Sequence, residues 1–203
     1  SFSEVVTPIT IDPTLKRGWP QSNDAENGVG LLTGNIPTIA DINNDGRKDI
    51  IFSYYCNYRG PNGPVNDVCV KIYDASGTVI NTIRLNNVFM YVGKIPIPIV
   101  ADFDGDGAGE IALSATTTSS ETFLYIFNAD GTSLSGFPRS FGRGTAYYMT
   151  AADMNLDGKA EIIIQSHIGA NDIFIISPDG SLLNSISVGA DTGLIHLFEQ
   201  LPS

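Results

Sequence analysis

Short apolar runs rich in β-branched and aromatic residues recur along the chain, and glycine-containing turns separate them. Three of these runs are too short for helices and predict strands: IIFSYY (50–55), IALSA (111–115) and IIIQS (162–166). Farther along, a Gly turn separates two alternating runs, the pattern of a β-hairpin. These hairpin segments are KIYDASGTVINTI (71–83), YIFNADGTSLSGF (125–137) and FIISPDGSLLNSI (174–186).

One unit therefore contains a short strand, a polar loop, a strand, a variable loop, a strand, a tight turn and a final strand. Four strands in this period are typical of a β-propeller blade, so we expect an all-β fold. The chain is expected to form a single β-propeller or propeller segment over 1–203, with three full four-stranded blades at 37–92, 93–144 and 145–190.

The two ends of the chain predict parts of a fourth, composite blade. The segment DPTLKRGWP (Asp12–Pro20) matches DGTSLSGFP (Asp130–Pro138) at its Asp, Thr, Gly, aromatic and Pro positions, so residues 1–36 are expected to be an outer half-blade. Residues 191–203 would add a terminal strand or tail that includes LIHLF. Two alternatives stay open: the chain is a segment of a longer propeller, or it assembles with copies of itself.

A nine-residue polar loop precedes each of the three apolar runs: DINNDGRKD from Asp41, DFDGDGAGE from Asp102 and DMNLDGKAE from Asp153. Each has an acid or amide at positions 1, 3 and 5, Gly at position 6 and a carboxylate at position 9. Oxygen donors at alternate positions around a Gly turn suit a hard cation of the size of calcium. Simple turn formation would explain the Gly and one Asp, but not the same spacing three times.

An EF-hand begins with the same spacing, but it requires a glutamate at position 12 and flanking helices. Here position 12 is Phe52, Leu113 and Ile164, and strands are predicted to follow. The sequence therefore predicts three Ca²⁺ sites of another kind.

The charge balance agrees with cation binding and excludes other partners. The chain has 22 acidic and 11 basic residues, a formal net charge of −11 at pH 7. The three loops hold ten of the carboxylates. A nucleic-acid footprint would require a basic face, and no cluster of Lys or Arg is present. No apolar run of 18 residues occurs, so no membrane span is expected.

The two cysteines, Cys56 and Cys69, bracket a 12-residue loop rich in Gly, Pro and Asn. A disulfide between the adjoining strand ends would close this loop and would indicate an oxidising compartment. Two reduced, packed cysteines are the alternative. Together with the calcium loops, a disulfide favours an extracellular location, either secreted or at the cell surface.

The acidic loop, its P-x-[IV]-A-D lead (Pro37–Asp41 and Pro98–Asp102) and the G-[FW]-P strand resemble FG-GAP/VCBS repeats, the blades of integrin-α-like propellers. The literal Phe-Gly and Gly-Ala-Pro signatures are not cleanly present, which favours the bacterial VCBS type. In that family the side chains at positions 1, 3, 5 and 9 and the carbonyl at position 7 bind Ca²⁺. The resemblance thus implies these ligands: Asp41, Asn43, Asp45, Arg47, Asp49; Asp102, Asp104, Asp106, Ala108, Glu110; Asp153, Asn155, Asp157, Lys159, Glu161.

Catalysis is not expected. The prominent carboxylates are assigned to metal, and the two histidines, His167 and His196, lie in or beside apolar strands. No nucleophile elbow, HExxH motif or phosphate-binding Gly loop is present. Some FG-GAP-like propellers cleave polysaccharides, so a polysaccharide lyase remains the enzymatic alternative.

Binding is the favoured function, because function in such scaffolds is concentrated in loops. Two loops stand out: the long loop 57–67, and RSFGRGTAYY (139–148), which interleaves aromatic and basic residues with glycine. Candidate contacts to carbohydrate or to an extracellular protein are Arg139, Phe141, Arg143, Tyr147 and Tyr148. Packing of these aromatics between blades is the alternative. We therefore expect a calcium-stabilised adhesion or binding module, or else a non-catalytic accessory domain of a larger secreted enzyme.

Overall fold

A computed structural model describes residues 36–58, 66–86, 88–89, 97–117, 121–143, 146–166 and 172–187. These residues form thirteen strands and no helix, as expected for an all-β chain. The described part of the chain therefore contains no apolar helix that could cross a membrane. The half-blade predicted for 1–36, except Ile36, the strand predicted within 191–203 and both histidines lie outside the described residues.

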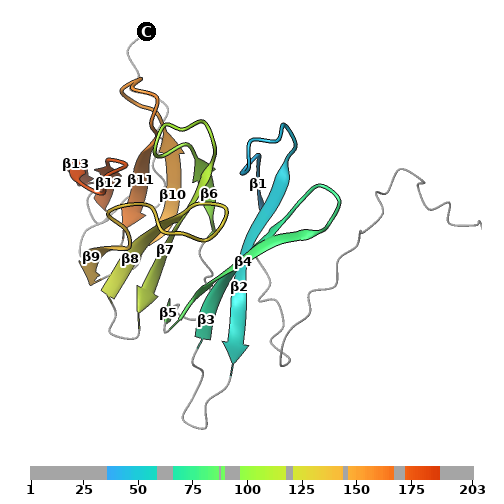
Figure 1. The fold of residues 1–203 in the computed structure, drawn as a ribbon. Coiled ribbons are helices and arrows are strands. Elements are labelled where there is room, and N and C mark those ends of the chain that lie inside the picture. Colours follow the sequence, from blue (N-terminus) through green and yellow to red (C-terminus); the bar gives the residue numbers. More distant parts are fainter. Residues whose placement is uncertain are drawn as a thin grey trace, which may run out of the picture.

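The strands form three antiparallel sheets that stand side by side (Figure 1). The first sheet contains, in order, β1 (Thr38–Ala40), β2 (Asp49–Tyr58), β3 (Asn66–Tyr73) and β4 (Val79–Leu85). The second contains β5 (Val88–Phe89), β6 (Ile99–Ala101), β7 (Glu110–Thr117), β8 (Glu121–Phe127) and β9 (Arg139–Arg143). The third contains β10 (Ala146–Ala152), β11 (Glu161–Ser166), β12 (Asp172–Ile176) and β13 (Leu182–Ser187).

The second sheet differs from the others at its first edge. Two short strands share one edge of β7: β6 pairs with residues 110–112 and β5 pairs with Thr116 and Thr117. Val88 and Phe89 belong to the first predicted unit by sequence, yet they pair with the second sheet. Val88 is buried between the two sheets, so this two-residue strand ties one sheet to the next.

Two hydrophobic layers hold the three sheets together. Ile51, Val70 and Ile72 of the first sheet pack with Ile111 and Leu113 of β7. The alternate residues of the second sheet point the other way, because successive side chains of a strand face opposite sides. These include Ala112, Leu124 and Ile126, which pack with Ile162, Ile164 and Ile176 of the third sheet. The middle sheet is therefore covered on both faces, which explains the unbroken apolar run of β7.

The hairpin turns form as predicted between β3 and β4 and between β12 and β13. In each, the amide of the turn glycine donates to a carbonyl three residues earlier: Gly77 to Asp74 at 3.0 Å and Gly180 to Ser177 at 2.8 Å. Both glycines have positive φ, 87° and 84°, a region that favours glycine.

Two predictions about the second unit were wrong. The segment after Gly131 was expected to continue as a strand, but it pairs only at Ser133 with Phe127 and then turns, with Phe137 N donating to Leu134 O at 3.1 Å. Gly136, with φ of 90°, and Pro138 interrupt the extended backbone, so the fourth strand begins at Arg139. The following segment, expected as the loop 139–148, instead forms β9 and the start of β10.

The disulfide prediction is confirmed. Cys56 in β2 and Cys69 in β3 are bonded, with their Cα atoms 5.7 Å apart. At the same end of the sheet, Asp67 in β3 pairs with Arg84 in β4 at 3.0 Å. Covalent and ionic contacts thus join three neighbouring strands at this end of the first sheet.

Replacing both cysteines (Cys56→Ala with Cys69→Ala) should lower the free energy of unfolding by about 3 kcal/mol, because the reduced unfolded chain regains the entropy of an open loop. Urea unfolding monitored by circular dichroism measures the loss. Wild-type protein treated with reductant is the control and should lose a similar amount. Equal stability of the oxidised wild type and the double variant would contradict the prediction.

Candidate metal centre

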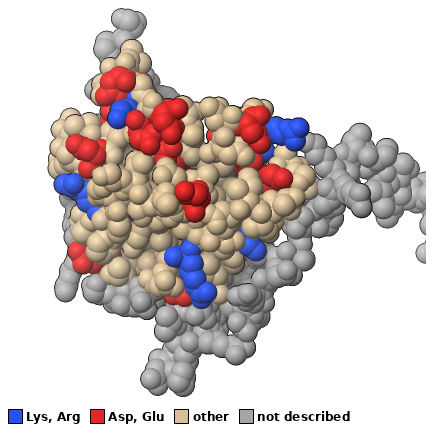
Figure 2. All heavy atoms as spheres, in the orientation of Figure 1, with Lys and Arg blue, Asp and Glu red and all other residues tan. Residues whose placement is uncertain are grey.

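The three acidic loops lie at the same end of the three sheets. Each loop connects an edge strand of its sheet to the strand that follows it in the chain: β1 to β2, β6 to β7 and β10 to β11 (Figure 1). On the face drawn in Figure 2, the acidic side chains gather along this upper edge. The first strands also lie side by side, β1 beside β6 and β6 beside β10. The sequence repeat therefore produces a row of three like sites.

Every loop folds around the carboxylate at position 1. One oxygen of Asp41, Asp102 and Asp153 accepts the backbone N–H of the glycine at position 6, at 2.9 Å in all three loops. The carboxylate at position 5 accepts the N–H of position 7, at 2.8, 2.7 and 2.9 Å along the chain. These bonds hold the N–H groups of Arg47, Ala108 and Lys159, the residues whose carbonyls the family resemblance names as ligands.

The loops require left-handed backbone at two positions. The position-6 glycines Gly46, Gly107 and Gly158 have φ of 81°, 89° and 89°. Position 4 is also left-handed, with φ of 56° at Asn44, 81° at Gly105 and 62° at Leu156. Sequence reasoning missed this second requirement. Asparagine and glycine at position 4 are a usable signal, but the leucine of the third loop conceals the pattern.

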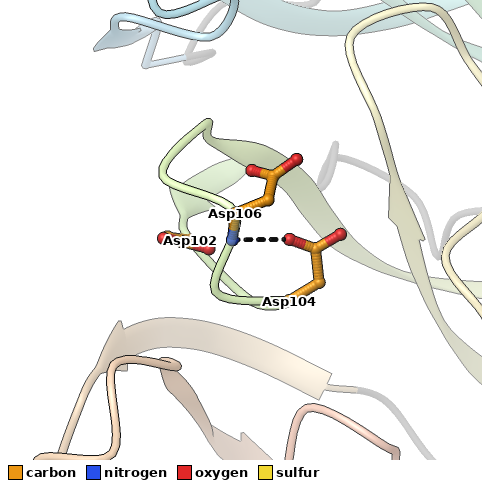
Figure 3. Close-up of side chains that lie close together, drawn as sticks. All are labelled: Asp102, Asp104 and Asp106. Carbon is orange, nitrogen blue, oxygen red and sulfur yellow. Dashed lines mark hydrogen bonds between the residues drawn. The ribbon is translucent and has the colours of Figure 1, made fainter.

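In the middle loop three carboxylates converge. One oxygen each from Asp102, Asp104 and Asp106 lies within 4.8 Å of the others (Figure 3). The backbone N–H of Asp106 donates to Asp104 Oδ1 at 3.1 Å, which orients the Asp104 carboxylate. Three like charges at this separation repel one another unless a cation lies between them.

The carboxylate at position 9 is buried in all three loops. Asp49 is 0% exposed, and Glu110 and Glu161 are each 2% exposed. Each accepts the N–H of position 2: Ile42 at 3.2 Å, Phe103 at 2.7 Å and Met154 at 2.8 Å. The second oxygen of Glu161 accepts Asn155 Nδ2 at 3.0 Å, whereas Asp49 Oδ1 has no hydrogen-bond partner. A buried acceptor without a donor is costly, and a cation would satisfy it.

Electrostatics agree with the geometry. Burial raises the pKa of Asp49, and its neighbours Asp45 and Asp41 raise it further. Burial also raises the pKa of Glu110 to about 6 against the Phe103 hydrogen bond, and Asp104 and Asp106 add to the rise. The metal-free first and second loops therefore penalise the ionised forms of Asp49 and Glu110. The predicted ligand atoms of the loops are all oxygens, the ligand type that a hard divalent cation prefers.

The loops also contact one another from sheet to sheet. The N–H of Ala160, at position 8 of the third loop, donates to Asp102 O at 2.8 Å. Gly109 holds position 8 of the second loop, and a Cβ there would lie 3.4 Å from Asp41 O. The second and third loops therefore each lie against the first residue of the loop that precedes them in the chain.

The residues predicted to contact a ligand are not brought together in one loop. Arg139 and Phe141 belong to β9 of the second sheet, and Tyr148 belongs to β10 of the third. Phe141 packs against the hydrophobic layer between these sheets, and the Arg139 side chain lies over Gly180 of the third sheet. Tyr148 is 63% exposed. The side chains of Arg143 and Tyr147 lie outside the described ones.

Comparison with known families bears on the same region. Residues 102–164 match the family model of the FG-GAP-like repeat. The match begins at position 1 of the second loop, ends within β11 and so includes the third loop. This part of the chain carries an FG-GAP-like repeat, as the resemblance predicted. No curated protein gives a significant match to the chain.

The buried acid of the second loop makes a prediction about the metal-free protein. With chelator at pH 7, Glu110→Gln should raise the free energy of unfolding by up to about 2 kcal/mol, because the neutral amide avoids the cost of a buried charge. The gain follows from a folded-state pKa near 6 against an ordinary 4.5.

The pH dependence provides the control. Because the pKa is raised on folding, the metal-free wild type loses stability as the pH rises from about 4.5 to above 6. At pH 4 the wild-type carboxyl is protonated, so the advantage of Glu110→Gln should disappear. Urea unfolding at both pH values measures the difference, and a Gln variant less stable than wild type at pH 7 would contradict it.

Proposed function

We propose that this chain forms part of an extracellular β-propeller that is stabilised by three Ca²⁺ ions and acts as a binding or adhesion module. The observation that carries the proposal is the buried carboxylate at position 9 of each loop, above all Asp49, whose Oδ1 lacks a hydrogen-bond partner. The same types of oxygen-bearing side chain, at positions 1, 3 and 5, recur with the position-9 carboxylate in all three loops.

The composition of the loops favours calcium over other cations. They contain no His or Cys, the ligands that favour zinc and copper. Mg²⁺ requires near-ideal octahedral geometry and retains several waters, whereas Ca²⁺ accepts six to eight oxygens in flexible arrangements. Five protein ligands in each loop, one of them a bidentate acid, suit Ca²⁺ better.

The position of the ligands supports a structural role for the ion. Position 1 follows the end of one strand, and position 9 is the first residue of the next: Asp49 begins β2, Glu110 begins β7 and Glu161 begins β11. An ion bound to both would link the two strands and neutralise the buried acid. Nearly all coordination positions would be filled by the protein, which leaves little room for a ligand hydroxyl.

Two features support an extracellular setting. The disulfide between Cys56 and Cys69 is of a kind that persists in oxidising compartments. Extracellular calcium modules bind at roughly 10⁻⁴ to 10⁻³ M, concentrations that calcium reaches outside cells.

The FG-GAP-like repeat suggests a binding or adhesion module, and the partner we propose is a carbohydrate or an extracellular protein. Of the predicted contact residues, Tyr148 has the exposed ring that stacking on a sugar or anchoring a protein requires. Phe141 packs against the layer between sheets, so its role is structural.

Chelation should lower the melting temperature, and added Ca²⁺ should restore it, because the ion binds the folded loops and not the unfolded chain. Isothermal titration calorimetry should give three sites. Asp41→Asn, Asp102→Asn and Asp153→Asn should each remove one site, because each loses a ligand and the N–H acceptor that shapes its loop.

The matched control is Asp130→Asn, which changes a carboxylate that caps a hairpin turn outside the loops through Thr132. It should leave three Ca²⁺ sites. An unchanged melting curve in chelator would contradict the structural role of the ion, and retention of three sites in all loop variants would contradict the assignment of the ligands.

A glycan array in saturating Ca²⁺ tests the binding function. Tyr148→Ala should reduce binding at least several-fold with little change in melting temperature, because the ring is exposed. Phe141→Ala should lower the melting temperature, because it leaves a gap between the second and third sheets. Absence of glycan binding by the wild type would leave a protein partner as the proposed ligand; equal binding by Tyr148→Ala would remove this residue from the site.

A further inference from the structure

A hydrogen bond between backbone atoms joins the second and third acidic loops. The N–H of Ala160, at position 8 of the third loop, donates to the carbonyl of Asp102, at position 1 of the second loop, at 2.8 Å. The peptide group that contains this N–H also contains the carbonyl of Lys159, the position-7 ligand that the family resemblance implies for the third loop. One peptide group therefore belongs to one proposed calcium site and contacts the first residue of the other.

The geometry of this peptide group directs its two ends to different loops. In a planar trans peptide the N–H and C=O bonds point in opposite directions. Because the N–H of Ala160 is directed to the second loop, the carbonyl of Lys159 is directed away from that loop. The N–H of Lys159 donates to Asp157 Oδ1 at 2.9 Å, so the same residue is held by an oxygen of the third loop. This orientation suits a carbonyl that serves as a ligand of the third site.

A second peptide group continues the connection to the buried acid of the second loop. The carbonyl of Asp102, which accepts the N–H of Ala160, belongs to the same peptide group as the N–H of Phe103. That N–H donates to Glu110 Oε2 at 2.7 Å. Two peptide groups thus connect position 7 of the third loop with the position-9 carboxylate of the second.

Hydrogen bonds in such a chain polarise one another where the local dielectric is low. When a bound cation polarises the carbonyl of Lys159, the N–H of Ala160 becomes a stronger donor to Asp102 O. The N–H of Phe103 then becomes a stronger donor to Glu110 by the same effect. The ionised form of Glu110 is stabilised as a result, and this is the form that a metal ligand must have.

The side chain of Lys159 also lies against the second loop. A Cβ at Gly105, at position 4 of that loop, would lie 3.2 Å from Lys159 Cε and 3.3 Å from its Cγ. The lysine stem therefore packs over the bare backbone of the glycine, on the loop in which three carboxylates converge. A positive charge so close to the second site opposes the binding of a cation there. The side chain and the peptide group of this junction thus act in opposite directions.

We infer that the second and third loops bind Ca²⁺ cooperatively, and that the Lys159–Ala160 peptide group is the positioning element that couples them. The inference rests on the proposed function, because it requires both loops to bind the ion, and it adds a regulation of those sites. By linkage, occupation of either loop raises the affinity of the other by the same factor.

The junction between the first and second loops is built less favourably for such coupling. Gly109 stands there at the position of Ala160, and a Cβ at Gly109 would lie 3.4 Å from Asp41 O. The bond that follows, from Ile42 N to Asp49 Oδ2, is 3.2 Å long, compared with 2.7 Å for the bond to Glu110. We therefore assign the coupling to the second and third loops.

Calorimetry on the full chain tests the coupling when the first site is removed by Asp41→Asn. In that background Asp153→Asn should weaken Ca²⁺ binding by the second loop about five-fold or more, and Asp102→Asn should weaken binding by the third loop by the same factor. Independent binding by the two loops would overturn the inference alone. Absence of Ca²⁺ binding by both loops would overturn the proposed function as well, so the two failures are distinguishable.

A backbone substitution tests the peptide group itself. Replacement of Ala160 by lactic acid turns the amide into an ester that has no N–H, so the coupling factor should fall to near one. The matched control replaces Leu134 by its α-hydroxy acid, which removes the 2.9 Å bond to Ile126 O outside the loops and should leave the coupling unchanged. Lys159→Met keeps the stem and removes the charge, so it should raise the affinity of the second loop and retain the coupling. Full coupling in the ester at position 160 would overturn the inference.

Because the ester removes a bond directly before β11, a second measurement uses a chain with every amide intact. The double variant Asp41→Asn with Asp102→Asn retains only the third site. Saturation of this variant with Ca²⁺ should move the amide proton resonance of Phe103 downfield, because its hydrogen bond to Glu110 is strengthened. A Phe103 resonance that does not move while the third loop is saturated would contradict the proposed connection.

Discussion

The buried carboxylate at position 9 is the constraint on which the loop end of the structure depends. Asp49, Glu110 and Glu161 begin the long strands β2, β7 and β11, and their side chains are buried from water. At Asp49 a single backbone N–H does not compensate the loss of hydration of a charge, which costs several kcal/mol. The side chains at positions 1, 3 and 5 of each loop are acids or amides, which add no positive charge. The proposed hard cation would resolve the conflict, because it would neutralise the buried acid.

This constraint also determines how the sheets follow one another. Position 2 of each loop donates its N–H to the buried acid, so its side chain is directed toward the next sheet. Ile42 lies in the layer between the first and second sheets, and Phe103 in the layer between the second and third. Because the N–H of Ala160 also binds Asp102 O, the third loop is fixed to the second. The acidic loops, the sheet order and the core packing are consequently one connected arrangement.

Much of this arrangement could be predicted from the sequence. Alternation and glycine turns indicated the strands, and the repeated acids indicated the loops, because both patterns are local. The disulfide followed from two strand ends that meet across a loop. Failures occurred where a distant contact decides the conformation. Phe137 is drawn into the layer between sheets, which bends a segment that alternates like a strand, and the edge left on β7 is completed by Val88 and Phe89 from the preceding unit. Leu156 adopts a left-handed conformation that its side chain disfavours, because the loop as a whole requires it.

The exposed apolar residues of the third sheet are explained by the order of the sheets, because each sheet covers one face of the sheet before it. Met154 occupies position 2 of its loop, where Ile42 and Phe103 are buried, yet it is 54% exposed. Leu182, Leu183 and Ile186 of β13 are exposed as well, whereas Ile83 and Leu85 of the corresponding strand β4 are buried against the second sheet. Among the described residues no sheet follows to cover them. The repeat specifies an interface on both faces of every sheet. Among the described residues, one face of the first sheet and the opposite face of the third sheet therefore have no neighbouring sheet.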